Sequence, residues 1–129
     1  MSDEQAPDWL PPAAVVIRGG KMKRGPMEAR VRKDHEKLGM YALSCCCSSS
    51  VYDRDELARI AQMPHRELRA STVERIRAAG FEISATPTHN NPTHATLRLP
   101  EPLRDEDWDA LEAAFDDPVP NVATLEGGE

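Results

Sequence analysis

An arginine followed by two glycines is the first feature of this sequence that could bind a ligand. The short apolar run over residues 13–17 is typical of a buried strand, and Arg18, Gly19 and Gly20 follow it directly. Glycines let the backbone come close to a ligand, and a guanidinium group offers a planar pair of donors that suits an anion. The same residues also fit an ordinary glycine turn beside a solvated arginine, so both interpretations stay open.

His35 stands between two carboxylates, Asp34 and Glu36, late in a helix that we expect over residues 27–38. A histidine here could act as a general base or bind a metal ion. Adjacent residues of a helix point about 100° apart, so at most two of the three side chains can face one ligand. The alternative is a charged helix end that faces solvent, where a histidine is favourable.

His94 and Thr96 form a histidine-x-threonine pattern on a strand that we expect over residues 94–99. Because alternate residues of a strand share a face, the two side chains lie side by side and can hold one phosphate. The pattern resembles half of the signature of the two-histidine phosphoesterases. None of His35, His65 and His89 begins the second half that this family has.

Tyr41 and Ser44 lie in the apolar stretch over residues 40–47, which we expect to form the next buried strand. Cys45, Cys46 and Cys47 complete this stretch. Three consecutive cysteines suit neither a disulfide framework nor a zinc site, because successive residues of a strand point to opposite faces. We therefore expect reduced cysteines and no bound metal, and Tyr41 and Ser44 become candidates for hydrogen bonding to a ligand.

The elements that must position these residues are short strands and helices. Capping-box patterns at Asp53 and Ser71 predict the starts of two helices. Alternation over residues 81–85 and 94–99 predicts an antiparallel hairpin, and a last amphipathic helix begins near Asp105. The predicted order is β-α-β-α-α-β-β-α, which is an α+β fold.

Charge and composition suggest the limits of the domain. We expect a disordered lead over residues 1–12, a single domain over 13–117 and an acidic tail over 118–129. The net charge of -6 argues against a protein that coats nucleic acid or an acidic membrane. Residues 13–47 nevertheless carry eight bases against three acids, whereas residues 100–129 carry one base against ten acids.

The sequence has no segment that suggests a membrane or an export signal. No stretch approaches 18 apolar residues, and the first residues are polar and acidic instead of basic and then apolar. We therefore expect a cytoplasmic protein with no membrane partner.

The stretch from Arg18 to Ser44 also resembles the mono-ADP-ribosyltransferases of the arginine-serine-glutamate class. In that family an arginine on the first core strand contacts NAD, a serine-rich strand follows a helix, and a later glutamate activates the nucleophile. The resemblance implies that Arg18 is the NAD-contacting arginine and Ser44 the first serine, with NAD as the cofactor. Two cysteines replace the rest of the serine motif, and Glu82 and Glu101 match the glutamate by position alone.

A longer stretch, over residues 16–121, resembles a group of small, largely uncharacterised actinobacterial proteins. The likeness rests on short motifs, which are Arg18-Gly19-Gly20, Asp34-His35-Glu36, Tyr41-Ala42-Leu43-Ser44, Ala78-Ala79-Gly80-Phe81, His94-Ala95-Thr96-Leu97 and the run from Pro118 to Asn121. The resemblance attaches no activity to the chain, but it implies that Asp34, His35, Glu36 and His94 form one site.

Together these features predict a ligand cleft lined by Arg18, His35, Tyr41, Ser44 and His94. The leading hypothesis is a protein that acts on a nucleotide or another phosphate-bearing ligand, as an ADP-ribosyltransferase-like toxin or effector. Arg18 and Tyr41 would bind the phosphate. The backbone of Gly19 and Gly20 and the hydroxyl of Thr96 would complete the binding group. His35, Ser44 and His94 would form the catalytic group.

A winged-helix DNA-binding regulator is one alternative hypothesis. Residues 55–62 and 71–79 would then be its two helices, and the hairpin would be its wing. Arg69, Arg75 and Arg77 would contact the duplex.

A non-catalytic antitoxin or immunity-type protein is another alternative. The acidic segment from Glu101 to Asp117 would then dock on a basic protein partner.

Overall fold

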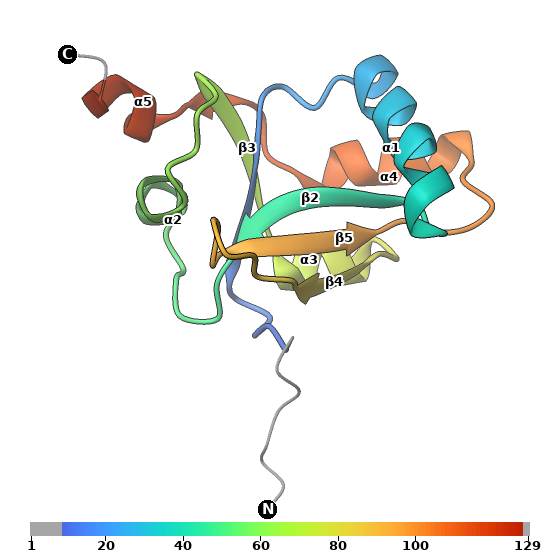
Figure 1. The fold of residues 1–129 in the computed structure, drawn as a ribbon, viewed down its shortest axis with the longest axis horizontal. Helices are drawn as coiled ribbons and strands as arrows, with labels where there is room; N and C mark the ends of the chain where they lie inside the picture. The colour runs from blue at the N-terminus through green and yellow to red at the C-terminus, as the bar shows by residue number, and fades with distance from the viewer. Residues whose placement is uncertain (1–8, 128–129) are drawn as a thin grey trace, which may run out of the picture.

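The computed structural model describes residues 9–127, which form one antiparallel sheet with helices on both faces (Figure 1). This arrangement confirms the predicted α+β class. The strands are β1 (Val15–Gly19), β2 (Ala42–Cys47), β3 (Glu67–Thr72), β4 (Glu82–Ala85), β5 (His94–Arg98) and β6 (Val119–Pro120). The helices are α1 (Arg24–Leu38), α2 (Arg54–Ala61), α3 (Val73–Ala78), α4 (Asp105–Ala114) and α5 (Val122–Gly127).

β1 lies inside the sheet, whose order is β4-β5-β2-β1-β3-β6 with every neighbouring pair antiparallel. β1 pairs with β3 along its whole length. It pairs with β2 only at Val16 and Ile17, which lie opposite Cys47 and Cys46. The two strands therefore separate beyond Ile17, and this opening positions the candidate site.

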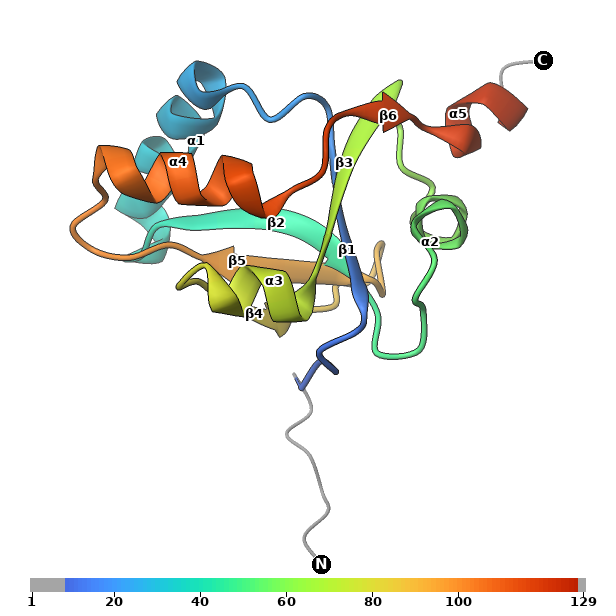
Figure 2. The same cartoon turned by 180° about the vertical axis from the view of Figure 1, so that it is seen from behind.

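Two hydrophobic cores lie on opposite faces of the sheet. On one face α1, α3 and α4 pack on strand residues that include Val16 and Leu97. On the other face α2 packs on a smaller core that includes Ile17 and Leu68. Figures 1 and 2 show α2 and α5 grouped at one side of the molecule, across β3 from α1 and α4. Ser44 lies between Leu43 and Cys45, whose side chains belong to the first core. Its own side chain therefore faces the side of the sheet that α2 covers, where it is exposed.

Several predictions based on local sequence are confirmed. The Asp53 side chain accepts a hydrogen bond from the N–H of Glu56 at the start of α2. Gly39 ends α1 with a φ of 72°, and Gly80 follows α3 with a φ of 99°, in the left-handed region that favours glycine. The predicted hairpin is the antiparallel β4–β5 pair.

The predicted element order is wrong at β3, which lies between α2 and α3. Arg69 and Ser71 are buried there, and the Ser71 hydroxyl donates a hydrogen bond to the carbonyl of Ala114. Because polar residues occupy buried positions in β3, the apolar alternation that marks a strand is missing. Thr72, not Ser71, is the cap of α3, and its hydroxyl accepts from the N–H of Arg75.

The described structure extends on both sides of residues 13–117. β6 and α5 occupy most of the segment expected as an acidic tail, because Asn121 is fully buried and bonds to the loop before β3. At the other end Leu10 is buried, and its carbonyl accepts a hydrogen bond from Arg77. Residues 1–8 of the expected disordered lead lie outside the described residues.

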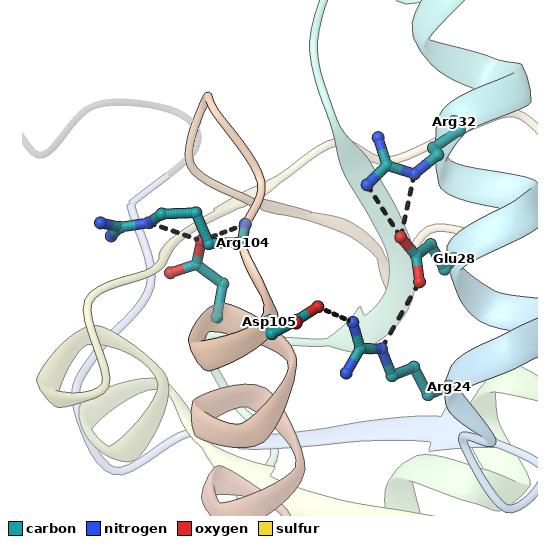
Figure 3. A network of polar contacts seen from close by, with 6 residues as sticks. Arg24, Glu28, Arg32, Arg104 and Asp105 are labelled. Atoms are coloured by element: carbon teal, nitrogen blue, oxygen red, sulfur yellow. Dashed lines mark hydrogen bonds and ion pairs between the residues drawn. The ribbon is translucent and has the colours of Figure 1, made fainter.

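Acidic residues near the C-terminus pair with basic residues from the rest of the chain. Figure 3 shows Arg24 between Glu28, on its own helix α1, and Asp105, at the start of α4. Further along the chain, Asp116 pairs with Arg75 at 2.9 Å. Acidic residues near the C-terminus therefore form ion pairs with basic residues that lie far from them in the sequence.

Candidate functional site

The candidate site lies where β1 and β2 separate. The guanidinium of Arg18 occupies this opening, and its Nη1 donates a hydrogen bond to the carbonyl of Ser44. A cavity of about 250 Å³, which we name the Arg18 cavity, lies beside it. Ala61 and Met63 contribute apolar surface. The polar lining comes from Arg18, Gly19, Ser44, His65, Asn91 and His94.

Arg18 has no carboxylate partner among residues 9–127. Its Nε is buried and makes no hydrogen bond. Burial lowers the pKa of Arg18 from its usual value, and the nearby charge of Arg30 acts in the same direction. A partly buried cation without a counter-charge is costly to the folded state, and such groups concentrate at functional sites.

Arg69 lies directly opposite Arg18 on β3 and has a different environment. It is only 5% exposed. Its Nε donates to the carbonyl of Asp116 at 2.7 Å, and its Nη2 donates to the carbonyls of Glu112 and Phe115, each at 3.1 Å. Arg69 is thus satisfied within the chain, whereas Arg18 has donors left for a ligand.

Gly19 and Gly20 are required for two different reasons. The imidazole of His65 lies against Gly19, where an added Cβ would stand 2.0 Å from His65 Nδ1. Gly20 has a φ of 86°, and its N–H donates to the carbonyl of Glu67 at 2.7 Å. Gly19 therefore makes room for the His65 ring, and Gly20 allows the turn that leaves β1.

We expect Gly19→Ala to push the His65 ring out of the Arg18 cavity and to lower the free energy of unfolding by less than about 1.5 kcal/mol, because the ring is exposed and can rotate toward solvent. Urea denaturation measures the loss, and the histidine signals in an NMR spectrum report the displaced ring. Gly25→Ala is the matched control, because open space surrounds Gly25 in α1. An equal loss of stability in both variants would contradict the steric explanation.

The ring of His94 is held by the hairpin. Its Nδ1–H donates to the carbonyl of Thr86 at 3.0 Å, and the Thr86 hydroxyl lies 2.9 Å from the same nitrogen. Because a carbonyl only accepts hydrogen bonds, this contact places the proton of the neutral ring on Nδ1. Nε2 of His94 is then the nitrogen that can accept a proton or a hydrogen bond at the cavity.

The three cysteines divide between the two faces of the sheet. Cys45 and Cys47 belong to the core under α1, α3 and α4. Burial raises the pKa of the Cys45 thiol above its usual range and that of Cys47 to about 12, so both remain protonated at neutral pH. Cys46 faces the opposite core and lines the Arg18 cavity, opposite His94 in the β2–β5 register.

His35 and Tyr41 do not line the Arg18 cavity. The His35 ring packs on Tyr41 with 4.2 Å between ring centroids, and its Nε2 lies 3.2 Å from a carboxylate oxygen of Glu101. Asp34 is engaged by Arg30 at 3.0 Å. The structure therefore brings Arg18, Gly19, Ser44 and His94 together and leaves His35 and Tyr41 in a separate cluster.

Thr96 belongs to another cavity, of about 510 Å³, beside β4 and β5. Its hydroxyl lies 2.8 Å from that of Thr86, which links Thr96 to His94 through a chain of hydroxyl contacts. Arg98 lines the same cavity, but Glu82 lies directly opposite it across the β4–β5 pair. A carboxylate beside the arginine makes this larger cavity a weaker anion site than the Arg18 cavity.

Sequence reasoning missed His65 and Asn121 as parts of the site. Asn121 is fully buried, and its amide donates to the carbonyls of Met63 and His65 at 2.9 and 2.7 Å. These bonds hold the loop that carries the His65 ring. The run from Pro118 to Asn121 belongs to the resemblance noted above, but no local pattern connects it with a loop more than fifty residues earlier.

The arginines of the winged-helix alternative are engaged inside the chain. Arg69 lies in β3 and not in a helix, Arg75 pairs with Asp116, and Arg77 donates to the carbonyl of Leu10.

Comparison of the chain with family models, with curated proteins and with solved structures finds no match. Within the described residues no group of three or more histidine, cysteine or acidic side chains could hold a metal ion. No helix of residues 9–127 has the length and apolar composition needed to cross a membrane.

Proposed function

We propose that the protein binds the phosphate group of a nucleotide or a related small molecule in the Arg18 cavity. The observation that carries the proposal is the guanidinium of Arg18, which is partly buried, has an unpartnered Nε and has no carboxylate partner among the described residues 9–127. A bound phosphate would supply the missing charge and would accept hydrogen bonds from the part of the guanidinium that lines the cavity.

The other groups of the cavity suit the same ligand. His65 and the Ser44 hydroxyl add donors beside Arg18, and the Nε2 atom of His94 is free to exchange a proton with the ligand. Ala61 and Met63 offer an apolar wall for a sugar or a base. The volume of about 250 Å³ lies just below the usual range for small-molecule pockets, which favours a phosphate with a sugar or a mononucleotide over a whole dinucleotide.

The ADP-ribosyltransferase hypothesis is the special case in which the phosphate belongs to NAD. It takes support from Arg18 and Ser44, the two residues that the resemblance implies, because they line one cavity and are joined by a hydrogen bond. NAD is therefore one of the ligands that a binding experiment has to include.

Calorimetric titration of the full chain with inorganic phosphate, adenosine monophosphate and NAD tests the proposal. We expect saturable binding of at least one of them, and we expect Arg18→Met to weaken it by roughly 10- to 100-fold, the value of a charge-assisted hydrogen bond of about 1.5–3 kcal/mol.

Arg32→Met is the control, because Arg32 lies on α1, pairs with Glu28 and does not line the cavity. Its affinities should match those of the wild type within about twofold. Absence of heat with all three ligands, or equal weakening by both substitutions, would refute a phosphate site at Arg18. If phosphate and adenosine monophosphate bind but NAD does not, only the ADP-ribosyltransferase hypothesis is refuted.

A further inference from the structure

A second cavity adjoins the Arg18 cavity, and half of its ten lining residues are lysine, arginine or histidine. It has a volume of about 290 Å³ and shares Arg18, Gly19 and His65 with the first. The rest of its basic lining comes from Lys21, Lys23 and Arg30. Within the part of the chain that the structure describes, no carboxylate lines it. We name it the basic cavity.

Not every charge of the basic cavity is available to a ligand. Lys21 lies 3.6 Å from Glu67, and Arg30 pairs with Asp34 at 3.0 Å. Both are ion pairs at the surface, where such contacts are weak and easily exchanged. Arg18 at one end and Lys23 at the other have no ion pair within residues 9–127. The basic cavity therefore holds an excess of positive charge.

The start of α1 adds to this excess. Lys23 is the N-cap residue, and its side chain makes no capping hydrogen bond. The first turn of α1 contains no acidic residue. The N-terminus of a helix carries partial positive charge, which favours a bound anion. Pro26 and Met27 line the basic cavity, but Pro26 has no N–H and the N–H of Met27 bonds to the carbonyl of Lys23. The helix therefore contributes the field of its dipole there, and the side chains contribute the hydrogen bonds.

We propose that the ligand carries a chain of two or more phosphates, which runs from the Arg18 cavity into the basic cavity past Gly19 and His65. This inference rests on the proposed phosphate site and names its ligand class as a polyphosphate ester, such as a nucleoside diphosphate or triphosphate. The first phosphate binds Arg18, and the later phosphates bind Lys23 near the positive end of the α1 dipole.

An extended nucleic acid strand is a poorer match for these observations. The chain carries a net charge of -6, and Arg69 of β3 and the two arginines of α3 bind carbonyls or carboxylates of the chain itself. A strand that crosses the surface needs a continuous basic track, whereas these cations gather around two small adjoining cavities.

Titration with phosphate, pyrophosphate and tripolyphosphate tests the inference without reference to any base. We expect pyrophosphate and tripolyphosphate to bind at least about tenfold more tightly than phosphate, because added charge-assisted contacts of this kind each contribute roughly a factor of ten. Lys23→Gln should remove most of this gain and leave the affinity for phosphate within about twofold of the wild type.

Lys33→Gln is the matched control, because Lys33 is an exposed lysine of α1 outside both cavities. Equal affinity for the three anions would overturn the polyphosphate inference and leave the phosphate site at Arg18 standing. Equal losses in the two lysine variants would overturn it as well, since total charge would then explain the binding. A ten-nucleotide single strand that binds more tightly than tripolyphosphate would overturn it in favour of nucleic acid. If the wild type does not bind phosphate, or binds it as tightly after Arg18→Met, the proposed function itself is refuted.

Discussion

Arg69→Met is expected to lower the free energy of unfolding by about 3–5 kcal/mol. The substitution removes a donor from three backbone carbonyls at the end of α4 and just beyond it, which belong to Glu112, Phe115 and Asp116. The carbonyl of Glu112 keeps the N–H of Phe115 as a donor, so the main loss is at Phe115 and Asp116. Each buried acceptor left without a partner costs about 1–3 kcal/mol. The residue is only 5% exposed, so water cannot replace the lost donors. Denaturation with guanidinium chloride, followed by circular dichroism, measures the change.

Arg18→Met is the matched control for this prediction, because the two arginines lie opposite each other on neighbouring strands. Within residues 9–127 Arg18 gives one hydrogen bond, to the carbonyl of Ser44, and its Nε is unpartnered. Methionine removes an uncompensated charge from a partly buried position, so stability should change by less than about 1 kcal/mol or increase. Similar destabilisation by both substitutions would contradict the distinction between a structural and a ligand-binding arginine.

This pair of arginines shows why buried charge alone does not identify a site. The β1–β3 register makes them neighbours. Carbonyls at the end of α4 and just beyond it surround the guanidinium of Arg69, whereas the guanidinium of Arg18 lies in the opening between β1 and β2, beside a cavity. A functional site is inferred from the donors that the fold leaves unused, and Arg18 has such donors.

The parts of the fold that the sequence predicted are those encoded within a few residues. The Asp53 cap, the left-handed glycines Gly39 and Gly80, and the β4–β5 hairpin each follow from local spacing. β3 was missed because Arg69 and Ser71 occupy buried positions in it and are satisfied by carbonyls of a helix more than forty residues later. A polar residue that is satisfied at long range removes the pattern on which strand prediction depends.

The residues of the candidate site also divide into those that local patterns predict and those whose position depends on distant parts of the chain. Ser44 belongs to a strand that local patterns predicted, whereas Arg18 and Gly19 were expected just after the first strand and in fact form its last two residues. Antiparallel pairing brings the three residues to one cavity. His65 belongs to an irregular loop, and its position depends on the buried side-chain amide of Asn121, which lies between β6 and α5 near the end of the chain. The charge pattern predicted a basic region over residues 13–47, and the ion pair of Arg24 with Asp105 shows that the chain itself uses one of these bases.

Asn121→Ala should lower the free energy of unfolding by about 2–4 kcal/mol, because two buried carbonyls lose their donor. These carbonyls, of Met63 and His65, lie in the loop before β3, and the Asn121 side chain also accepts from the N–H of Ala123. The loss should be largest in the β6–α5 segment and in the loop. Urea denaturation gives the global value, and hydrogen exchange of the loop amides locates it.

The same substitution should weaken phosphate binding under conditions in which the protein remains folded, because the His65 ring is no longer held against Gly19. Asn121 touches no ligand and acts only by positioning the loop. Asn90→Ala is the matched control, since Asn90 is an exposed asparagine at the tip of the β4–β5 hairpin, and it should change stability by less than about 0.5 kcal/mol. Unchanged phosphate affinity in folded Asn121→Ala protein would show that the site does not need a fixed His65, and the ligand would then depend on Arg18 and the hairpin side chains alone.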